Sequence, residues 1–297
     1  MEAAPHTQSE GTEIPNMRGT SGLAPVLSLF LLTSTGCDKP VASPSGARGT
    51  IVTSGDLAND LAMVRQARIY FDHHSVGANI LAGVRQIDRE VAGSKLRLAS
   101  PEEANSIQGP VLVEGGGGHN GDPKGKIDHF AKVIRVDAGL KPDVAFMKLC
   151  FTDIGPRTDV ENIFAYYRRS MESLEREYPG IRFAHVTVPL TAKPVGLKAR
   201  LFRLIGREVW DDASNRKRAE FNRLLRETFA SDPVFDLARL EATAPDGNPV
   251  GMYLDEPSMF RGYTNDGGHL NSLGERLAGA GFIRVVANAR GTRREQR

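Results

Sequence analysis

Apolar residues follow two alternating patterns along the chain. Short, nearly continuous apolar runs have the length of buried strands, and they lie at residues 68–71, 110–115, 142–150, 181–190 and 233–237. Between them, apolar residues recur every three or four positions, which predicts helices over residues 75–92, 126–140, 159–180, 215–230 and 271–289. Because strands alternate with helices, the pattern predicts an α/β fold: a three-layer, doubly wound parallel sheet with helices on both faces.

Polar segments follow several of these strands, and ligands of such sheets bind outside the carboxyl ends of the strands. "HHS" at residues 73–75 follows the first strand, "GGGGHNGD" at 115–122 follows the second, and "KLCFTD" at 148–153 ends the third. A fourth segment, "DGGHLN" at residues 266–271, precedes the last helix. We therefore expect the chemistry of the protein to lie in these four segments.

The fourth segment pairs a carboxylate with an imidazole. Two glycines separate Asp266 from His269, a spacing that lets a tight turn bring the carboxylate back to the ring. Asp266 would then keep one ring nitrogen protonated and leave the other free as a base. Ser75, at the start of a predicted helix, would be the nucleophile that this base activates, and the helix N-terminus favours negative charge nearby.

Simpler roles are open to these residues. Serine is a favoured N-cap, so Ser75 could serve only the helix that it precedes, and His269 could cap or pack against the last helix. The catalytic interpretation is favoured because nucleophile, base and orienting acid are all present. Of His73 and His74, we expect one to face the core and the other the rim of the site, and both are kept as candidate rim residues.

In these segments the sequence resembles the SGNH (GDSL-type) hydrolases. "HHSVG" stands in the serine block, "DGGHLN" in the Asp-x-x-His block, and "FTD" in the block that usually holds asparagine and aspartate. The resemblance covers most of residues 67–288 in block order. It implies a flavodoxin-like α/β sandwich, esterase or lipase activity without metal or organic cofactor, and catalysis by Ser75, His269 and Asp266.

The resemblance also implies an oxyanion hole, a set of hydrogen-bond donors for the negatively charged oxygen of the reaction intermediate. Ser75 and Gly118 match two of its contributors. Thr152 stands where the family has an asparagine, beside a retained Asp153 that we assign to the rim of the site. Asn120, in the glycine-rich run, is the alternative side-chain donor, because a threonine hydroxyl lacks the geometry of an amide.

The N-terminal region carries features of an export signal. Residues 17–37 run from Met17 and one arginine through "LAPVLSLFLLTSTG" to Cys37, which resembles a bacterial lipoprotein signal with a lipidated cysteine. The apolar stretch is too short, and too interrupted by Pro25, to span a membrane as a mature helix. Residues 1–16 carry three glutamates and no positive charge, so we interpret them as preceding the true start, with a disordered leader as the alternative.

These features divide the chain into segments. Residues 38–56 are rich in Pro, Gly, Ser and Thr and are typical of a flexible linker. Residues 57–289 would form one hydrolase-like domain, and residues 290–297 a disordered basic tail. We expect an exported, membrane-anchored lipoprotein of the bacterial cell envelope.

Composition changes this picture little. The net charge of +2 over 297 residues gives no strong field for a nucleic-acid partner. The two cysteines, Cys37 and Cys150, lack metal-ligand spacing, and Cys150 is expected to be buried at a strand end. Arg200 to Asp212 holds the only tryptophan, and it predicts either a lid at the site or a plain amphipathic surface helix.

Two functions are open at this point. The first is a serine hydrolase that cleaves carboxylic esters, including O-acyl groups of carbohydrates or esters of other small molecules, through an acyl-enzyme. The second is a cell-envelope protein on the same fold that binds glycans without catalysis or transfers an acyl group. The second is motivated by His73-His74 in place of the usual Gly-Asp, and by Thr152 in place of the asparagine.

Overall fold

A computed structural model describes residues 54–93, 95–136, 140–206, 209–250 and 257–295. The leader at residues 1–16, the lipoprotein signal at 17–37 with Cys37, and most of the linker at 38–56 lie outside the described residues. Helix α1 begins at Ser54, so the folded part begins slightly before the expected boundary at residue 57.

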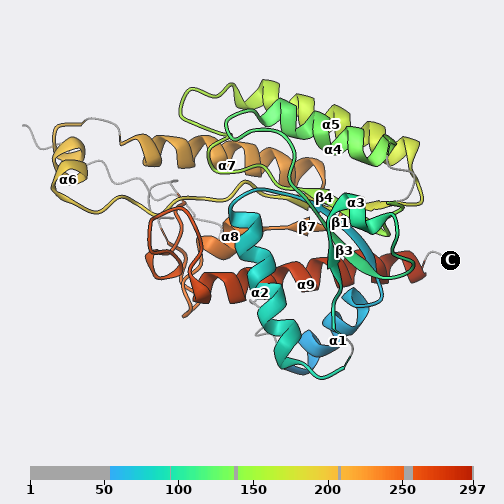
Figure 1. Ribbon diagram of the computed structural model, residues 1–297. Helices are drawn as coiled ribbons and strands as arrows, with labels where there is room; N and C mark the ends of the chain where they lie inside the picture. The colour runs from blue at the N-terminus through green and yellow to red at the C-terminus, as the bar shows by residue number, and fades with distance from the viewer. Residues whose placement is uncertain (1–53, 94, 137–139, 207–208, 251–256, 296–297) are drawn as a thin grey trace, which may run out of the picture. The chain divides into compact units, whose positions relative to one another are not determined.

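A parallel sheet forms the centre of the described part of the chain (Figure 1). Its strands lie in the order β2-β3-β1-β4-β5, and their bounds are Arg68–Asp72 (β1), Leu98–Ala99 (β2), Val111–Gly115 (β3), Val144–Met147 (β4) and Arg182–Phe183 (β5). A second parallel pair is formed by His185–Val186 (β6) and Val234–Phe235 (β7). The N–H of Ala184, between β5 and β6, donates to Ala145 O of β4, so this pair continues the sheet.

The strand order confirms the expected fold class. When β5 and β6 are taken as one strand and the short edge strand β2 is set aside, the strands lie in the order second, first, third, fourth, fifth. This is the order of a flavodoxin-like doubly wound sheet, in which the switch point next to the first strand is the usual ligand site.

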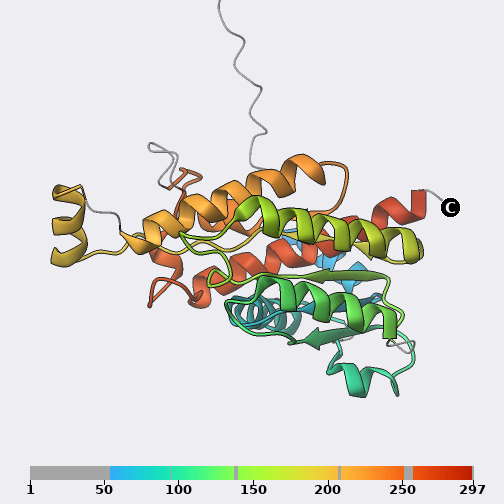
Figure 2. The same ribbon diagram turned by 90° about the horizontal axis from the view of Figure 1, so that it is seen from above.

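Helices cover both faces of the sheet (Figures 1 and 2). One face carries Ser54–Val64 (α1), Val76–Glu90 (α2) and Ser272–Glu295 (α9), and the other carries Pro123–Val136 (α4), Val160–Glu177 (α5) and Trp210–Thr228 (α7). Shorter elements are Pro101–Ala104 (α3), Leu197–Leu204 (α6), Leu237–Glu241 (α8) and the 3-10 turn Arg261–Tyr263 (η2). No helix among the described residues is long and apolar enough to cross a bilayer.

The central residues of the long strands are apolar because both faces of the sheet are buried. In β1, Ile69 and Phe71 belong to the core beneath α1, α2 and α9, whereas Tyr70 belongs to the core beneath α4, α5 and α7. Successive side chains of a strand point to opposite faces, so a strand with helices on both sides lacks the polar alternation of a surface strand.

Helices α2 and α9 touch through glycines. A Cβ atom on Gly83 would lie 1.8 Å from the carbonyl oxygen of Glu275, and one on Gly279 would lie 2.5 Å from the carbonyl carbon of Gly83. The two backbones therefore approach more closely than any side chain would allow. Ser75 directly precedes α2 and His269 lies shortly before α9, so this contact fixes both residues on one framework.

Several helices extend beyond their predicted bounds. Helix α4 begins at Pro123 and α7 at Trp210, in both cases before the apolar periodicity starts. Helix α9 continues to Glu295, so the tail expected at residues 290–297 is helical over 290–295, and Arg290 donates to Met63 O of α1. Polar helical turns carry no apolar period, and the hydropathy pattern therefore missed these turns of α4, α7 and α9.

Candidate functional site

Ser75 occupies a sharp turn between β1 and α2. Its backbone angles are φ 52° and ψ −106°, a conformation that costs a residue with a side chain on the order of 1–3 kcal/mol. Although Ser75 is in the N-cap position of α2, its side chain makes no capping hydrogen bond. The Ser75 hydroxyl is hydrogen-bonded to Nε2 of His269 instead. The side chain of Ser75 therefore does not cap the helix, which was the simpler role considered for it.

His269 links Ser75 to Asp266. Its Nδ1–H donates to Asp266 Oδ2 at 2.6 Å, while its Nε2 faces the Ser75 hydroxyl. The side chains of His269 and Asp266 are 48% and 57% exposed. The structure thus brings the serine, the imidazole and the carboxylate into one hydrogen-bonded chain that is open to solvent.

The turn from Asp266 to His269 determines which ring nitrogen of His269 carries the proton. The backbone N–H groups of Gly268 and His269 each donate to Asp266 Oδ1 at 2.8 Å, and they hold the pKa of that carboxyl below its ordinary value. Gly267 has a φ of +99°, a conformation that favours glycine. An ionised Asp266 keeps the proton on Nδ1 of His269, which leaves the lone pair of Nε2 directed at the Ser75 hydroxyl.

The Asp266 turn is tied to the helix that Ser75 precedes. Asn79 lies one turn into α2, and its Oδ1 accepts from Leu270 N at 3.3 Å while its Nδ2 donates to Glu275 at 2.8 Å. On the other side of the turn, Ala192 N donates to Gly267 O at 2.8 Å. Sequence reasoning missed Asn79, although its position one helical turn after Ser75 placed it on the same side of α2.

The glycine-rich run passes next to Ser75. Asp72, the last residue of β1, accepts from Gly117 N at 3.2 Å and pairs with Nδ1 of His129 at 2.9 Å. Nε2 of His74 is hydrogen-bonded to Gly117 O at 2.9 Å. A Cβ on Gly117 would lie 2.0 Å from the His129 ring, so only glycine fits there. His74, expected at the rim, is partly buried and holds this loop in place.

Asn120 is oriented by a buried ion pair. Lys126 Nζ donates to Asn120 Oδ1 at 2.8 Å and to Asp153 Oδ2 at 2.7 Å. Because its carbonyl oxygen is bound to Lys126, Asn120 has its amide N–H groups left to donate, and the described residues give them no partner. Asn120 and Thr152 are both exposed.

Two residues expected at the rim lie below the surface. The side chain of Asp153 is 0% exposed, and it also accepts from the N–H groups of Gly121 and Cys150, so it is the counterion that holds two loops together. His73 is 8% exposed and packs on Phe71 with ring centroids 4.6 Å apart. Burial, with a smaller contribution from the charge of Lys148, lowers the pKa of His73 to about 3, so its ring is neutral and belongs to the core.

A cleft of about 410 Å³ opens beside His269. Its lining includes Phe151, Arg261, and the turn that holds Asp266. It also includes Val195, before α6, and Asp211, in the first turn of α7. The predicted lid or surface helix at residues 200–212 therefore flanks the cleft, and it includes most of α6, which projects from the body of the domain (Figure 1).

Comparisons with known proteins were made on both sequence and structure. No family model and no curated protein matches the sequence. Solved structures that match include a candidate GDSL-like lipase from Parabacteroides merdae, with 14% identity, 76% of this chain and 96% of that chain covered, and a TM-score of 0.46. The acetyl xylan esterase AlAXEase matches with 17% identity, coverage of 73% and 98%, and a TM-score of 0.43.

A third match is the catalytic domain of the peptidoglycan O-acetyltransferase OatA from Streptococcus pneumoniae. It has 11% identity, coverage of 75% and 94%, and a TM-score of 0.37. A GDSL-like lipase is thus among the similar structures. Since all three TM-scores are below 0.5, we base the assignment of the site on the side-chain geometry of this chain.

The buried His73 predicts a specific acid sensitivity. The unfolded chain protonates this ring near pH 6.5 and the folded chain only near pH 3, so the unfolded state binds more protons between these values. Stability is therefore lost as the pH falls below about 6.5. Between pH 7 and pH 5, urea unfolding should show that the wild type loses about 2 kcal/mol more than His73→Leu.

His119→Leu is the matched control for this measurement. His119 is exposed, so its replacement controls for the substitution of a histidine by leucine as such, and the variant should match the wild type at both pH values. An identical pH dependence of the wild type and His73→Leu would show that the His73 ring is solvated in the folded protein.

Proposed function

We propose that this protein is a serine hydrolase that cleaves carboxylic esters through an acyl-enzyme. The observation that carries the proposal is the hydrogen bond from the Ser75 hydroxyl to Nε2 of His269, made in place of the helix cap that this serine could have formed. A serine hydroxyl is a weak nucleophile until a base removes its proton. Here the base is present, and Asp266 sets its tautomer.

In the first half of the reaction, Ser75 Oγ forms a bond to the ester carbonyl carbon while His269 Nε2 accepts the hydroxyl proton. The carbonyl oxygen becomes negatively charged, and the N–H groups of Ser75 and Gly118 with the amide of Asn120 would donate to it. The bond to the alcohol oxygen then breaks. The alcohol takes the proton from His269, and the acyl group stays on Ser75.

In the second half, water replaces the alcohol. His269 Nε2 removes a proton from water as the water oxygen attacks the acyl carbon, and Ser75 leaves with that proton. The exposure of His269 and Asp266 supports release of the acyl group to water, because solvent reaches the base directly. Transfer to another hydroxyl would use the same acyl-enzyme, but it is favoured where the site excludes water.

The cleft supports an acylated polar alcohol as the substrate. Its walls combine apolar side chains, Phe151 and Val195, with charged ones, Asp211 and Arg261. Carbohydrates offer both hydroxyl groups and apolar ring faces, so an O-acyl carbohydrate matches this mixed lining. A glycan-binding protein without catalysis, the second function considered, would have no need for a strained serine aligned with a base.

We also propose that the enzyme is exported and anchored to the membrane through a lipid on Cys37. The proposal is supported by the charge and apolar pattern of residues 17–37. When the full chain is expressed in bacteria, a labelled fatty acid should be incorporated into the wild type and not into Cys37→Ser. Cys150→Ser is the control and should still be labelled. If the wild type incorporates no label, the proposed lipid anchor and the membrane localisation that depends on it are both wrong.

The role of Ser75 predicts covalent labelling by a fluorophosphonate probe. The probe should modify the wild type, expressed from residue 38 onward, and should not modify Ser75→Ala. Hydrolysis of p-nitrophenyl acetate should fall at least ~10³-fold in the same variant, because no other nucleophile faces His269 in the described residues.

Ser106→Ala is the control, since Ser106 is exposed and its hydroxyl donates only to the Glu103 carbonyl. It should be labelled like the wild type. If well-folded wild type resists the probe and binds acetylated glycans with unchanged affinity in Ser75→Ala, the protein is a binding module and not a hydrolase.

The orientation of Asn120 predicts that its amide is the side-chain donor of the oxyanion hole. Asn120→Ala should lower kcat by ~10²- to 10³-fold with little change in KM, because the lost hydrogen bond forms mainly in the transition state. Thr152→Val should keep kcat within a few-fold. The opposite result, a large loss in Thr152→Val alone, would assign the donor to the threonine that replaces the asparagine of the SGNH block.

A further inference from the structure

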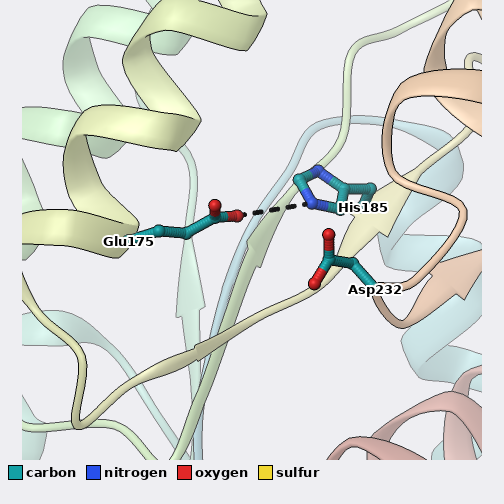
Figure 3. A group of neighbouring side chains, drawn as sticks. All are labelled: Glu175, His185 and Asp232. Atoms are coloured by element: carbon teal, nitrogen blue, oxygen red, sulfur yellow. Dashed lines mark ion pairs between the residues drawn. The ribbon is translucent and has the colours of Figure 1, made fainter.

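A second cluster of titratable side chains lies at the opposite edge of the sheet from Ser75. Glu175 lies near the carboxyl end of α5, His185 begins β6, and Asp232 lies just before β7 (Figure 3). One ligand atom from each residue lies within 4.8 Å of those of the other two. Asp232 Oδ1 lies 3.6 Å from Nη2 of Arg182, the first residue of β5, so the carboxylates of this cluster lie where the strands begin, away from the candidate active site at their carboxyl ends.

His185 is the fixed centre of this cluster. Its side chain is 0% exposed, and its ring stacks on Phe229 with centroids 3.7 Å apart. On one side, its Nδ1 is hydrogen-bonded to the Tyr167 hydroxyl at 2.9 Å. On the other side, its Nε2 faces the two carboxylates and has no hydrogen-bond partner in the described part of the chain.

A buried ring nitrogen without a partner is costly, so a ligand for it is expected. The Tyr167 hydroxyl can accept from Nδ1–H, and burial raises the pKa of Tyr167, which keeps it a neutral phenol. In this tautomer the lone pair of Nε2 points toward Glu175, whose Oε1 lies 3.7 Å away. A lone pair directed at carboxylate oxygens repels them unless a cation lies between.

We propose that Glu175, His185 and Asp232 bind a divalent transition-metal ion, with Zn²⁺ the preferred ion. One imidazole nitrogen and two carboxylate oxygens are ligands that Zn²⁺ accepts, and a water molecule would complete four-fold coordination. Tyr167 would act behind His185 as the hydrogen-bond partner that sets its tautomer. Mg²⁺ and Ca²⁺ prefer sites of oxygen ligands only and should bind more weakly.

The geometry requires only a small adjustment. Ligand atoms of a tetrahedral zinc site lie about 3.3 Å apart, and the carboxylates must therefore move slightly inward. Glu175 and Asp232 can do so because their side chains are 34% and 25% exposed, whereas His185 is fully buried and its ring stacks on Phe229. Figure 3 shows both carboxylates directed toward the His185 ring.

The competing arrangement is a protonated His185 that forms ion pairs with the two carboxylates. Arg182 already supplies one positive charge, since its Nη2 lies 3.6 Å from Asp232 Oδ1. With two carboxylates and one guanidinium, the cluster retains one net negative charge, which either a proton on His185 or a metal ion would offset. Binding of Zn²⁺ at neutral pH decides between the two.

The test measures metal binding on chelator-treated full-length protein. Calorimetry should give one Zn²⁺ per chain. At free Zn²⁺ a hundredfold above Kd, Tm should rise by about 5–10 °C, because the ion would tie α5 to β6 and β7. Glu175→Gln and Asp232→Asn, which change partly exposed groups, should each weaken binding at least tenfold. Co²⁺ bound in place of Zn²⁺ should give an absorption spectrum typical of four-fold coordination.

Glu172→Gln is the matched control on the same helix, since Glu172 pairs with Arg168 and lies outside the cluster. It should bind Zn²⁺ like the wild type. The proposal is wrong if the wild type binds no Zn²⁺, or if Glu175→Gln and Asp232→Asn bind it as tightly as Glu172→Gln. Fluorophosphonate labelling of Ser75 is measured separately, so this result and the hydrolase proposal can fail independently.

Discussion

The close contact between α2 and α9 is the constraint on which the candidate site depends. Ser75 and His269 lie at distant positions in the chain, and neither segment could hold the other in place alone. The absence of side chains at Gly83 and Gly279 lets the two helices meet backbone to backbone. Asn79 then joins α2 to the segment after His269 by two hydrogen bonds. A hydrogen bond between serine and imidazole needs placement to within a few tenths of an ångström, and rigid packing of two helices provides it more reliably than loops do.

The strained backbone of Ser75 is a second consequence of this arrangement. The turn costs free energy and leaves α2 without a side-chain cap, so interactions with neighbouring residues must hold the backbone in this conformation. These interactions come from the strands and loops on either side. Asp72 holds the glycine-rich loop, His74 holds the same loop from the other side, and the buried His73 anchors the segment in the core. These contacts fix the stretch that links β1 to α2, and they leave the Ser75 hydroxyl directed at His269.

Local signals predicted the residues whose roles depend on short spacing, and they failed where partners are distant in sequence. The strands follow from short apolar runs, the Asp266 turn from a spacing of three residues, and the position of Ser75 from the strand that it follows. Asp153 looked like a rim residue because "FTD" ends a strand. Its partner, Lys126, lies in α4, 27 residues earlier in the chain, and no local pattern indicates that pair. The same limit applies to His73. A histidine after a strand fits a site or a core equally well, and only the contact with Phe71 decides the matter.

Buried polar groups gather where the backbone leaves the regular ladder at the carboxyl edge of the sheet. Arg218 is 3% exposed, and its guanidinium donates to the carbonyl groups of Phe151 and Ile154 and to the Thr191 hydroxyl. Glu241 accepts from Leu190 N, and burial raises the pKa of its carboxyl to about 8. Apolar side chains at these positions would have a lower desolvation cost, but they could not form hydrogen bonds with the backbone of irregular loops. The loops that line the cleft must remain irregular to present Phe151 and the Asp266 turn. Buried polar groups beneath them are therefore needed to pair with their backbone.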